Sequence, residues 1–293
     1  MKIAAAAYPL DFHETWDSYE EKLARWVDGA AIQGAELLVF PEYGAMELAS
    51  LAGAEAAAGL ESSLRAVAER MGRAGEVLAG LARDQGVHIL GPSGPVWEGE
   101  RPVNRATLYT PEGRRAHQDK QITTRFEREE WHVVPGGPLV LFETSLGRLG
   151  VLICYDCEFP LLARSLAEAG AEVLLVPSCT DTLAGYSRVR IGAMARALEN
   201  QCVTVQAPTV GPAEWCPAVD PNLGAAAIYA PPDRGFPETG VLAVGAMGAP
   251  GWVVAEVSLD AIRTVRAEGG VLNFAHWPEQ EPRLRHVTQA CLT

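Results

Sequence analysis

Short apolar runs alternate along the chain with longer segments in which apolar residues recur every three to four positions. The short runs predict buried β-strands, and the longer segments predict amphipathic helices. The expected strands cover residues 3–8, 37–40, 87–90, 106–109, 114–118, 139–142, 149–153, 173–176, 202–205, 225–229, 241–244 and 252–257. The expected helices cover residues 16–33, 62–84, 161–169, 187–200 and 259–266.

This order of elements predicts an α/β fold. So many apolar strands need cover on their faces, which favours sheets packed together with helices outside. No low-complexity linker and no repeat of solenoid length divides the chain, so residues 1–275 are predicted to form a single domain. Residues 276–293 are polar and contain prolines, and we expect this tail to lie across the surface or against a partner subunit.

The charge of the chain excludes several kinds of partner. Its 293 residues include 37 acidic and 24 basic side chains, a formal net charge of −13. Such an excess does not neutralise phosphates, so we expect neither a nucleic-acid nor an anionic membrane partner. With 48% hydrophobic and 21% charged residues, the chain has the composition of an ordered globular protein.

Neither a signal peptide nor a membrane span is expected. The first apolar stretch reaches Asp11 too soon for a signal peptide. The long uncharged run, residues 239–255, is interrupted by four glycines and Pro250, which favours two strands around a turn. Six cysteines in a chain of this kind favour thiols over a disulfide framework, and a cytoplasmic location is expected.

Three reactive side chains each stand just beyond a predicted strand: Glu42, Lys120 and Cys154. No phosphate-binding glycine loop, dinucleotide fingerprint, zinc-binding helix or serine elbow occurs in the sequence. Because sites in α/β sheets assemble at strand ends, a carboxylate, an ammonium and a thiol could converge in one pocket.

Such a trio has a use in acyl transfer. A thiol attacks as a thiolate and needs a base or a nearby cation, and Glu42 could accept its proton. Lys120 could stabilise the thiolate and the oxyanion formed on the substrate carbonyl. The backbone N–H of Tyr155 is a candidate second oxyanion donor.

The sequence around these residues resembles the nitrilase superfamily of carbon–nitrogen hydrolases. The matching motifs are Phe40-Pro41-Glu42, Asp119-Lys120, and Ile153-Cys154-Tyr155-Asp156 followed by Phe159-Pro160. Glu127 follows the lysine by seven positions, as a second acidic residue often does in that family. The resemblance spans roughly residues 2 to 275, and the Tyr-Asp after the cysteine is similar to the amidase-like branch.

The resemblance implies an α-β-β-α sandwich of the nitrilase type that dimerises into a larger helix-flanked assembly. It implies that Cys154 is the nucleophile, that Lys120 stabilises the tetrahedral species, and that Glu42 is general base and acid. Glu127 would hold Lys120 or the substrate in place. The implied reaction is hydrolysis of a small linear amide or N-carbamoyl compound through a cysteine thioester, without a metal or organic cofactor.

Two departures from the family pattern occur. Gln118-Asp119-Lys120-Gln121-Ile122 stands where Tyr-Arg-Lys-x-His-Leu is frequent, so the pocket wall is expected to differ. Leu161 stands where a glutamate is frequent, which removes a possible surface pair near Arg164.

Several alternatives stay open. A nitrilase would use the same three residues, and a catalytically idle protein of this fold is conceivable. Cys154 and Cys157 form a C-x-x-C motif that also occurs in thiol-redox and metal-binding proteins. Glu127 could belong to a solvated acidic loop. Asp181 and Tyr186 are candidate substrate-binding residues, although Asp181 would equally suit a helix N-cap.

Overall fold

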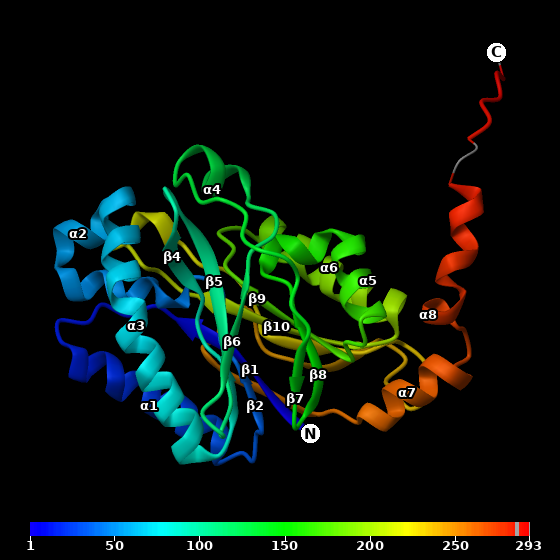
Figure 1. Ribbon diagram of the computed structural model, residues 1–293, viewed down its shortest axis with the longest axis horizontal. Helices are drawn as coiled ribbons and strands as arrows, with labels where there is room; N and C mark the ends of the chain where they lie inside the picture. The colour runs from blue at the N-terminus through cyan, green and yellow to red at the C-terminus, as the bar shows by residue number, and fades with distance from the viewer. Residues whose placement is uncertain (285–286, 293) are drawn as a thin grey trace.

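The computed structural model describes residues 1–284 and 287–292 of the protein (Figure 1). Its strands are β1 Lys2–Pro9, β2 Leu37–Val39, β3 His88–Leu90, β4 Gly94–Glu98, β5 Arg101–Tyr109, β6 Arg115–Asp119, β7 Phe142–Thr144, β8 Gly147–Val151, β9 Val173–Ser178, β10 Val203–Val210, β11 Ala227–Tyr229, β12 Val241–Val244 and β13 Gly251–Glu256. Its α-helices are α1 Trp16–Ala31, α2 Ala54–Ala58, α3 Leu60–Gln85, α4 Arg125–Glu129, α5 Pro160–Glu168, α6 Leu183–Asn200, α7 Leu259–Glu268 and α8 Asn273–His276. Short 3-10 helices are η1 Gly44–Ala52, η2 Cys154–Glu158, η3 Pro217–Val219 and η4 Trp277–Arg283.

The strands form two sheets that meet along β1 and β10. The first sheet runs β4-β5-β3-β2-β1-β13, with β6 also paired to β5. The second runs β7-β8-β9-β10-β11-β12. At the junction, Tyr8 and Pro9 of β1 pair in parallel with Thr209 and Val210 of β10. Because β1, β2, β8, β9 and β10 are paired in parallel, their carboxyl ends lie at one edge of the fold.

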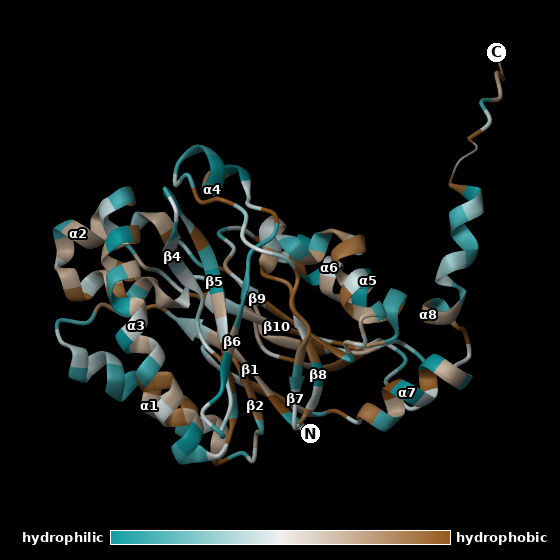
Figure 2. Cartoon of the chain, viewed as in Figure 1, coloured by the Kyte–Doolittle hydropathy of each residue, from teal (hydrophilic) through white to brown (hydrophobic). Residues whose placement is uncertain are grey.

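Strand β1 shows how the layers arise. Its alternate residues Ala4 and Tyr8 belong to the core beneath α1 and α3, whereas Ile3 and Ala5 belong to the core shared with the second sheet. A strand covered on both faces is apolar throughout, as the sequence of β1 is. Helices α5 and α6 cover the outer face of the second sheet (Figure 1). Figure 2 shows apolar residues on the strands that lie between the layer of α1 and α3 and the layer of α5 and α6. The predicted α-β-β-α sandwich is confirmed.

Some elements lie outside the sequence prediction. Strand β4, helices α2 and α4, and the 3-10 helices were not expected, because each is short and several are rich in polar residues or alanine. Helix α6 begins at Leu183, one turn before the predicted start at residue 187, because Thr182 caps it by accepting a bond from Gly185 N. The alternative of an N-cap role for Asp181 is therefore excluded, since the adjacent Thr182 is the N-cap of α6.

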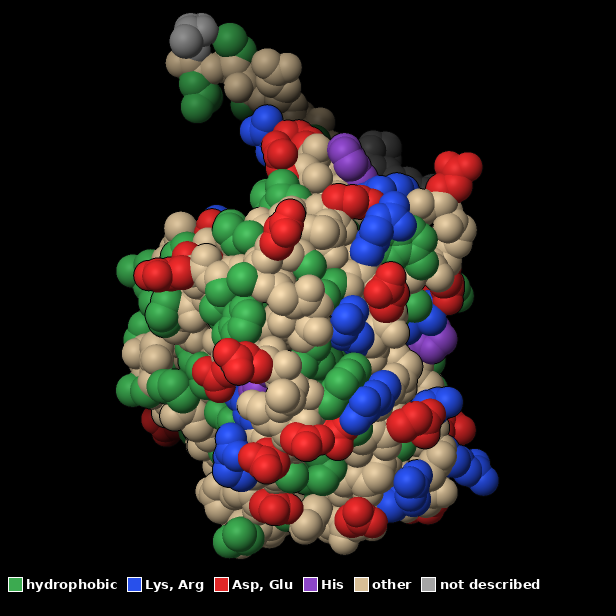
Figure 3. All heavy atoms as spheres, turned by 90° about the vertical axis from the view of Figure 1, so that its left-hand side faces the viewer, with side chains coloured by type: hydrophobic (Ala, Val, Ile, Leu, Met, Phe, Trp, Pro, Cys, Tyr) green, Lys and Arg blue, Asp and Glu red, His purple; other side chains and the backbone are tan. Residues whose placement is uncertain are grey.

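The surface carries charges of both signs. On the face that carries α1, α2 and α3, acidic and basic side chains are interspersed (Figure 3). Some of them join helices or strands, as Arg73 does with Glu20 at 2.8 Å. Within residues 1–284 and 287–292, no helix is both long enough and apolar enough to cross a membrane.

The C-terminal segment leaves the body of the molecule. Residues after α7 form α8 and η4, and Figure 1 shows η4 projecting away from the sheets. Arg164 of α5 anchors the start of this segment, because its guanidinium lies over the rings of Phe274 and Trp277 at 4.7 and 4.9 Å. The predicted boundary at residue 275 and the contact of the tail with a partner stay predictions.

Candidate active site

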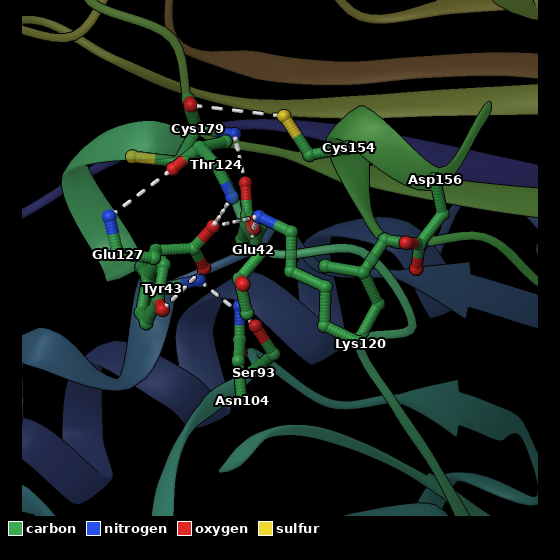
Figure 4. A network of polar contacts seen from close by, with 12 residues as sticks. Glu42, Tyr43, Ser93, Asn104, Lys120, Thr124, Glu127, Cys154, Asp156 and Cys179 are labelled. Atoms are coloured by element: carbon green, nitrogen blue, oxygen red, sulfur yellow. Dashed lines mark hydrogen bonds and ion pairs between the residues drawn. The ribbon is translucent and has the colours of Figure 1, made fainter. Parts of the chain in front are cut away.

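Four predicted site residues meet at the carboxyl edge of the sheets (Figure 4). Glu42 lies just past β2, Lys120 directly follows β6, Glu127 lies on α4, and Cys154 opens η2 after β8. Each is 5% exposed or less. Buried charges are costly unless they are paired, so the partners of these side chains determine what the cluster can do.

Lys120 bridges the two carboxylates. Its Nζ lies 2.6 Å from Glu42 Oε1 and 2.7 Å from Glu127 Oε2. Burial lowers the pKa of Lys120, but the charges of Glu127 and Glu42 outweigh burial and raise the pKa well above its ordinary value. The ammonium is therefore a fixed positive charge in the site.

Glu42 is held by neutral donors on either side. Asn104 Nδ2 donates to Oε1 at 3.1 Å, and the backbone N–H of Cys179 donates to Oε2 at 2.9 Å. Burial raises the pKa of Glu42 to about 7, against the opposing pull of Lys120. A carboxyl group with that pKa can both accept and release a proton near neutral pH.

Glu127 differs from the acidic residues next to it in the sequence. Glu129 and Glu130 are exposed, whereas Glu127 is 2% exposed and forms a capping box with Thr124 at the start of α4. Tyr43 Oη donates to Glu127 Oε1 at 2.6 Å. Although burial raises the pKa of Glu127, Lys120 and the donated bonds outweigh it and lower the pKa. Glu127 therefore stays ionised beside Lys120.

Cys154 occupies a strained backbone position. Its φ is +52°, in the left-handed region that non-glycine residues rarely adopt. Its thiol donates to Cys179 O across 3.8 Å. Burial and the charge of Glu42 raise the pKa of the Cys154 thiol well above its ordinary value, and Lys120 only partly opposes them. The resting group is thus a neutral thiol, and it becomes nucleophilic when a base removes its proton.

A cavity of about 340 Å³ opens over these residues. Aromatic rings form much of its wall: Tyr43, Phe126, Trp131 and Tyr155. Its other charged lining residues are Glu158, Asp181, Arg188 and Asp220, all partly or fully exposed. The cavity therefore has an enclosed charged floor, apolar walls and a polar mouth, as expected of a site for a small polar molecule.

The remaining predicted residues fall in different places. Asp181 lines the mouth of the cavity, and Tyr155 is the second residue of η2, where backbone N–H groups lack intrahelical acceptors. Tyr186 is 5% exposed and is not among the lining residues; it lies beside Tyr229 of β11. The structure does not bring Tyr186 to the site.

The second cysteine of the C-x-x-C motif points away from the site. Cys157 is fully buried, and its thiol donates to Val189 O of α6 at 3.5 Å. Burial raises the pKa of Cys157, which makes it an inert thiol. Within the described parts of the chain, no group of three or more His, Cys, Asp or Glu side chains is arranged to hold a metal ion.

Sequence reasoning missed several residues of the site. Thr124 and Glu127 have the spacing of a capping box, a signal that would have separated Glu127 from its acidic neighbours. Tyr43 directly follows Glu42, yet only the fold shows that its hydroxyl reaches Glu127. Asn104 and Arg188 carry no sequence signal, because they come from β5 and α6 and reach the site through tertiary packing.

Comparisons with known proteins show the family of the chain. A family model for carbon–nitrogen hydrolases matches residues 2–265. A probable hydrolase of Bacillus subtilis, YhcX, is 30% identical over 92% of this chain and 52% of its own length. Deaminated glutathione amidase of Synechocystis sp. is 31% identical over 83% of this chain and 86% of its own length. The chain spans about half the length of the Bacillus relative and of a similar amidase of Yersinia enterocolitica.

Solved structures give the same result. The amidase of Nesterenkonia sp. AN1 is 28% identical with a TM-score of 0.65, over 92% of this chain and 97% of that one; in one structure acrylamide is added to its active-site cysteine. Nit3 of Saccharomyces cerevisiae, 19% identical with a TM-score of 0.70 over 91% and 93% of the chains, shares the fold.

The family model and the matches show that the chain belongs to the carbon–nitrogen hydrolase family. The predicted resemblance to its amidase-like branch is confirmed, because both the curated relatives and the solved structures include amidases.

Proposed function

We propose that this protein hydrolyses a non-peptide carbon–nitrogen bond in a small linear amide or N-carbamoyl compound. The observation that carries the proposal is the contact of Lys120 with both Glu42 and Glu127 on the floor of a cavity that also holds the Cys154 thiol. A base of pKa about 7, a fixed ammonium and a thiol are the groups that acyl transfer through cysteine requires. The amidase activities named for the relatives support the same reaction.

The first half of the reaction forms a thioester. Glu42 takes the thiol proton as Cys154 Sγ bonds to the carbonyl carbon of the substrate. The carbonyl oxygen becomes an oxyanion, and Lys120 with the N–H of Tyr155 stabilises it. Glu42 then gives its proton to the leaving nitrogen, the carbon–nitrogen bond breaks, and ammonia or an amine departs.

The second half releases the acid. Glu42 takes a proton from water, the hydroxide oxygen bonds to the thioester carbon, and the carbon–sulfur bond breaks as the proton returns to sulfur. Glu127 positions Lys120 throughout, since it contacts Nζ at 2.7 Å and is itself fixed by Tyr43 and Thr124. Asp181 is proposed to contact the distal part of the substrate from the mouth of the cavity.

The proposal is tested with a panel of short amides, N-carbamoyl compounds and nitriles, with ammonia release measured with and without a chelator. We expect release from amides or N-carbamoyl compounds that the chelator does not change, because no proposed step uses a metal. Release from nitriles alone would assign the nitrilase reaction to the same residues. Activity that disappears with chelator would contradict the mechanism.

Replacing Cys157 by alanine tests the rival role of the C-x-x-C motif. We expect the turnover number to stay within about threefold of the wild type, because Cys157 contacts α6 and not the cavity. Steady-state ammonia release measures this, with the melting temperature as a check of the fold. Complete loss of activity in a folded variant would favour a dithiol mechanism.

We further propose a cytoplasmic homodimer or higher homo-oligomer. Free thiols at residues 154, 157, 179, 202 and 216 suit a reducing compartment. Leu161 on α5 and Ile191 on α6 are 69% and 67% exposed, and an interface would cover such residues.

A further inference from the structure

We propose that Asp156 is a positioning residue that fixes the distance between the nucleophile and the oxyanion-stabilising lysine by binding the backbone of both loops. The inference rests on the proposed hydrolase function, and it assigns a role to a fully buried carboxylate that takes no part in the steps described above. Figure 4 shows Asp156 beside the segment that carries Cys154, with Lys120 next to it.

The carboxylate of Asp156 accepts bonds from two separate segments. From the loop after Lys120, Ile122 N donates to Oδ1 at 2.8 Å, and Gln121 N lies 3.2 Å from both oxygens. From the segment before Cys154, Ile153 N donates to Oδ2 at 3.1 Å. A single side chain thus joins the residue before the nucleophile to the two residues after the lysine.

The lysine loop, residues 120–122, depends on Asp156 because it lies beyond the end of strand β6. Strand β6 ends at Asp119, and Lys120 still has backbone partners, since its N–H donates to Asn104 O and its carbonyl accepts from Gly136 N, both at 2.9 Å. The next two N–H groups, those of Gln121 and Ile122, go to Asp156. Beyond the end of the sheet, Asp156 therefore provides the hydrogen-bond acceptors that fix the backbone of the lysine loop.

The nucleophile depends on it for a different reason. The left-handed backbone of Cys154 costs conformational energy and persists only when the surroundings hold it. Asp156 closes the turn around Cys154 twice, because its own N–H donates to Ile153 O at 3.1 Å while its side chain accepts from Ile153 N. Losing the carboxylate would release the turn and the lysine loop together.

The contact requires an acceptor without hydrogens. A carboxylate offers lone pairs on both oxygens, so it can serve all three N–H groups. The amide of asparagine would direct an NH₂ group at one of these donors and leave it unpaired. Burial raises the pKa of Asp156 to about 6, with Lys120 opposing, so the group is ionised at about pH 8, where the test is made.

The test compares Asp156→Asn and Asp156→Glu with Asp233→Asn as the matched control. Asp233 also accepts backbone bonds, from Arg234 N at 2.6 Å and Gly270 N at 2.8 Å, but it lies in an exposed turn outside the cavity lining. Three quantities are measured at about pH 8: kcat and KM for an amide substrate, the rate of Cys154 alkylation by iodoacetamide, and the melting temperature.

For Asp156→Asn we expect kcat to fall at least about thirtyfold while KM changes less than about threefold, because substrate still binds but the reacting groups are misplaced. Alkylation of Cys154 should slow in parallel. Asp156→Glu keeps an ionised acceptor and should recover part of kcat, whereas the control should match the wild type. A merely structural role would lower the melting temperature without this division between kcat and KM.

Wild-type kcat and alkylation in folded Asp156→Asn would overturn the inference, as would an equal fall of kcat in the control. If the asparagine variant does not fold, the glutamate variant decides, since wild-type rates there would show that the position of the carboxylate is unimportant. If the wild type hydrolyses no amide, the proposed function fails. The alkylation rates would still test the role of Asp156, because they require only the thiol and its base.

Discussion

Replacement of Cys154 by alanine is expected to lower kcat by at least about 10⁴-fold, the largest effect of any single substitution in this protein. Without sulfur no thioester can form, and neither Glu42 nor Lys120 can replace the nucleophile, because each already uses its charge on the other. Serine at this position should also be nearly inactive, since its hydroxyl is a far weaker acid than a thiol and the same base would have to ionise it.

The direct measurement is mass spectrometry of the protein mixed with a slowly hydrolysed amide. The wild type should gain the mass of one acyl group on the peptide that contains Cys154, and the alanine variant should gain none. Cys202→Ala is the matched control, because Cys202 is equally buried but donates to Arg196 O and does not line the cavity. Full ammonia release by the Cys154 variant would refute the mechanism.

The fold could be predicted from the sequence where burial dictates the residues. A strand such as β1 must be apolar on both faces, so its apolar run, residues 3–8, was visible without the structure. Strand β4 was not visible, because it opens with Gly94-Pro95 and ends at exposed Glu98, and pairing with β5 fixes it instead. Tertiary pairing of this kind leaves little trace in a single strand's own sequence.

The site also has a part that the sequence predicts and a part that it does not. Glu42, Lys120 and Cys154 follow strands or occur in recognisable motifs, so their convergence could be inferred from the rule that sites form at strand ends. The residues that fix them are different in kind. Asn104 and the backbone of Cys179 hold Glu42 across 62 and 137 residues of sequence, and nothing local marks either as a partner.

Glu127 shows how much a fold can separate neighbours in sequence. Glu127 and Glu129 lie in the same charged turn, yet one is buried against Lys120 and the other pairs with Arg125 on the surface at 2.8 Å. The difference follows from the helical geometry of α4, where residues two positions apart face different directions. The pattern of charges alone could not distinguish a buried carboxylate that contacts Lys120 from a solvated one.

Replacement of Glu42 by glutamine is expected to lower kcat/KM by roughly 10²- to 10⁴-fold, the usual contribution of a general base. Glutamine keeps the shape, and its carbonyl oxygen can still accept the bond from Asn104, whereas its NH₂ group would face the Cys179 N–H and leave that donor unpaired. One lost bond costs about 1–3 kcal/mol, so the fold should persist with a lower melting temperature. It cannot take the proton of the Cys154 thiol, whose raised pKa keeps it neutral at rest. Ammonia release and the melting temperature measure the two expectations separately.

The pH dependence identifies the base. Glu42 is active when ionised, and burial raises its pKa to about 7, so wild-type kcat/KM should rise with pH through about 7 and then level off. Lys120 and Glu127 stay charged throughout that range, because their pKa values are shifted away from neutrality. In Glu42→Gln the rise through about 7 should disappear, leaving only a rise near 6 from Asp156, whose pKa burial raises to about 6. Glu129→Gln, which removes an exposed carboxylate nearby, should keep the rise through about 7. A rise that persists unchanged in Glu42→Gln would show that another group accepts the thiol proton. Glu42 of the wild type would then serve only as an ion-pair partner of Lys120.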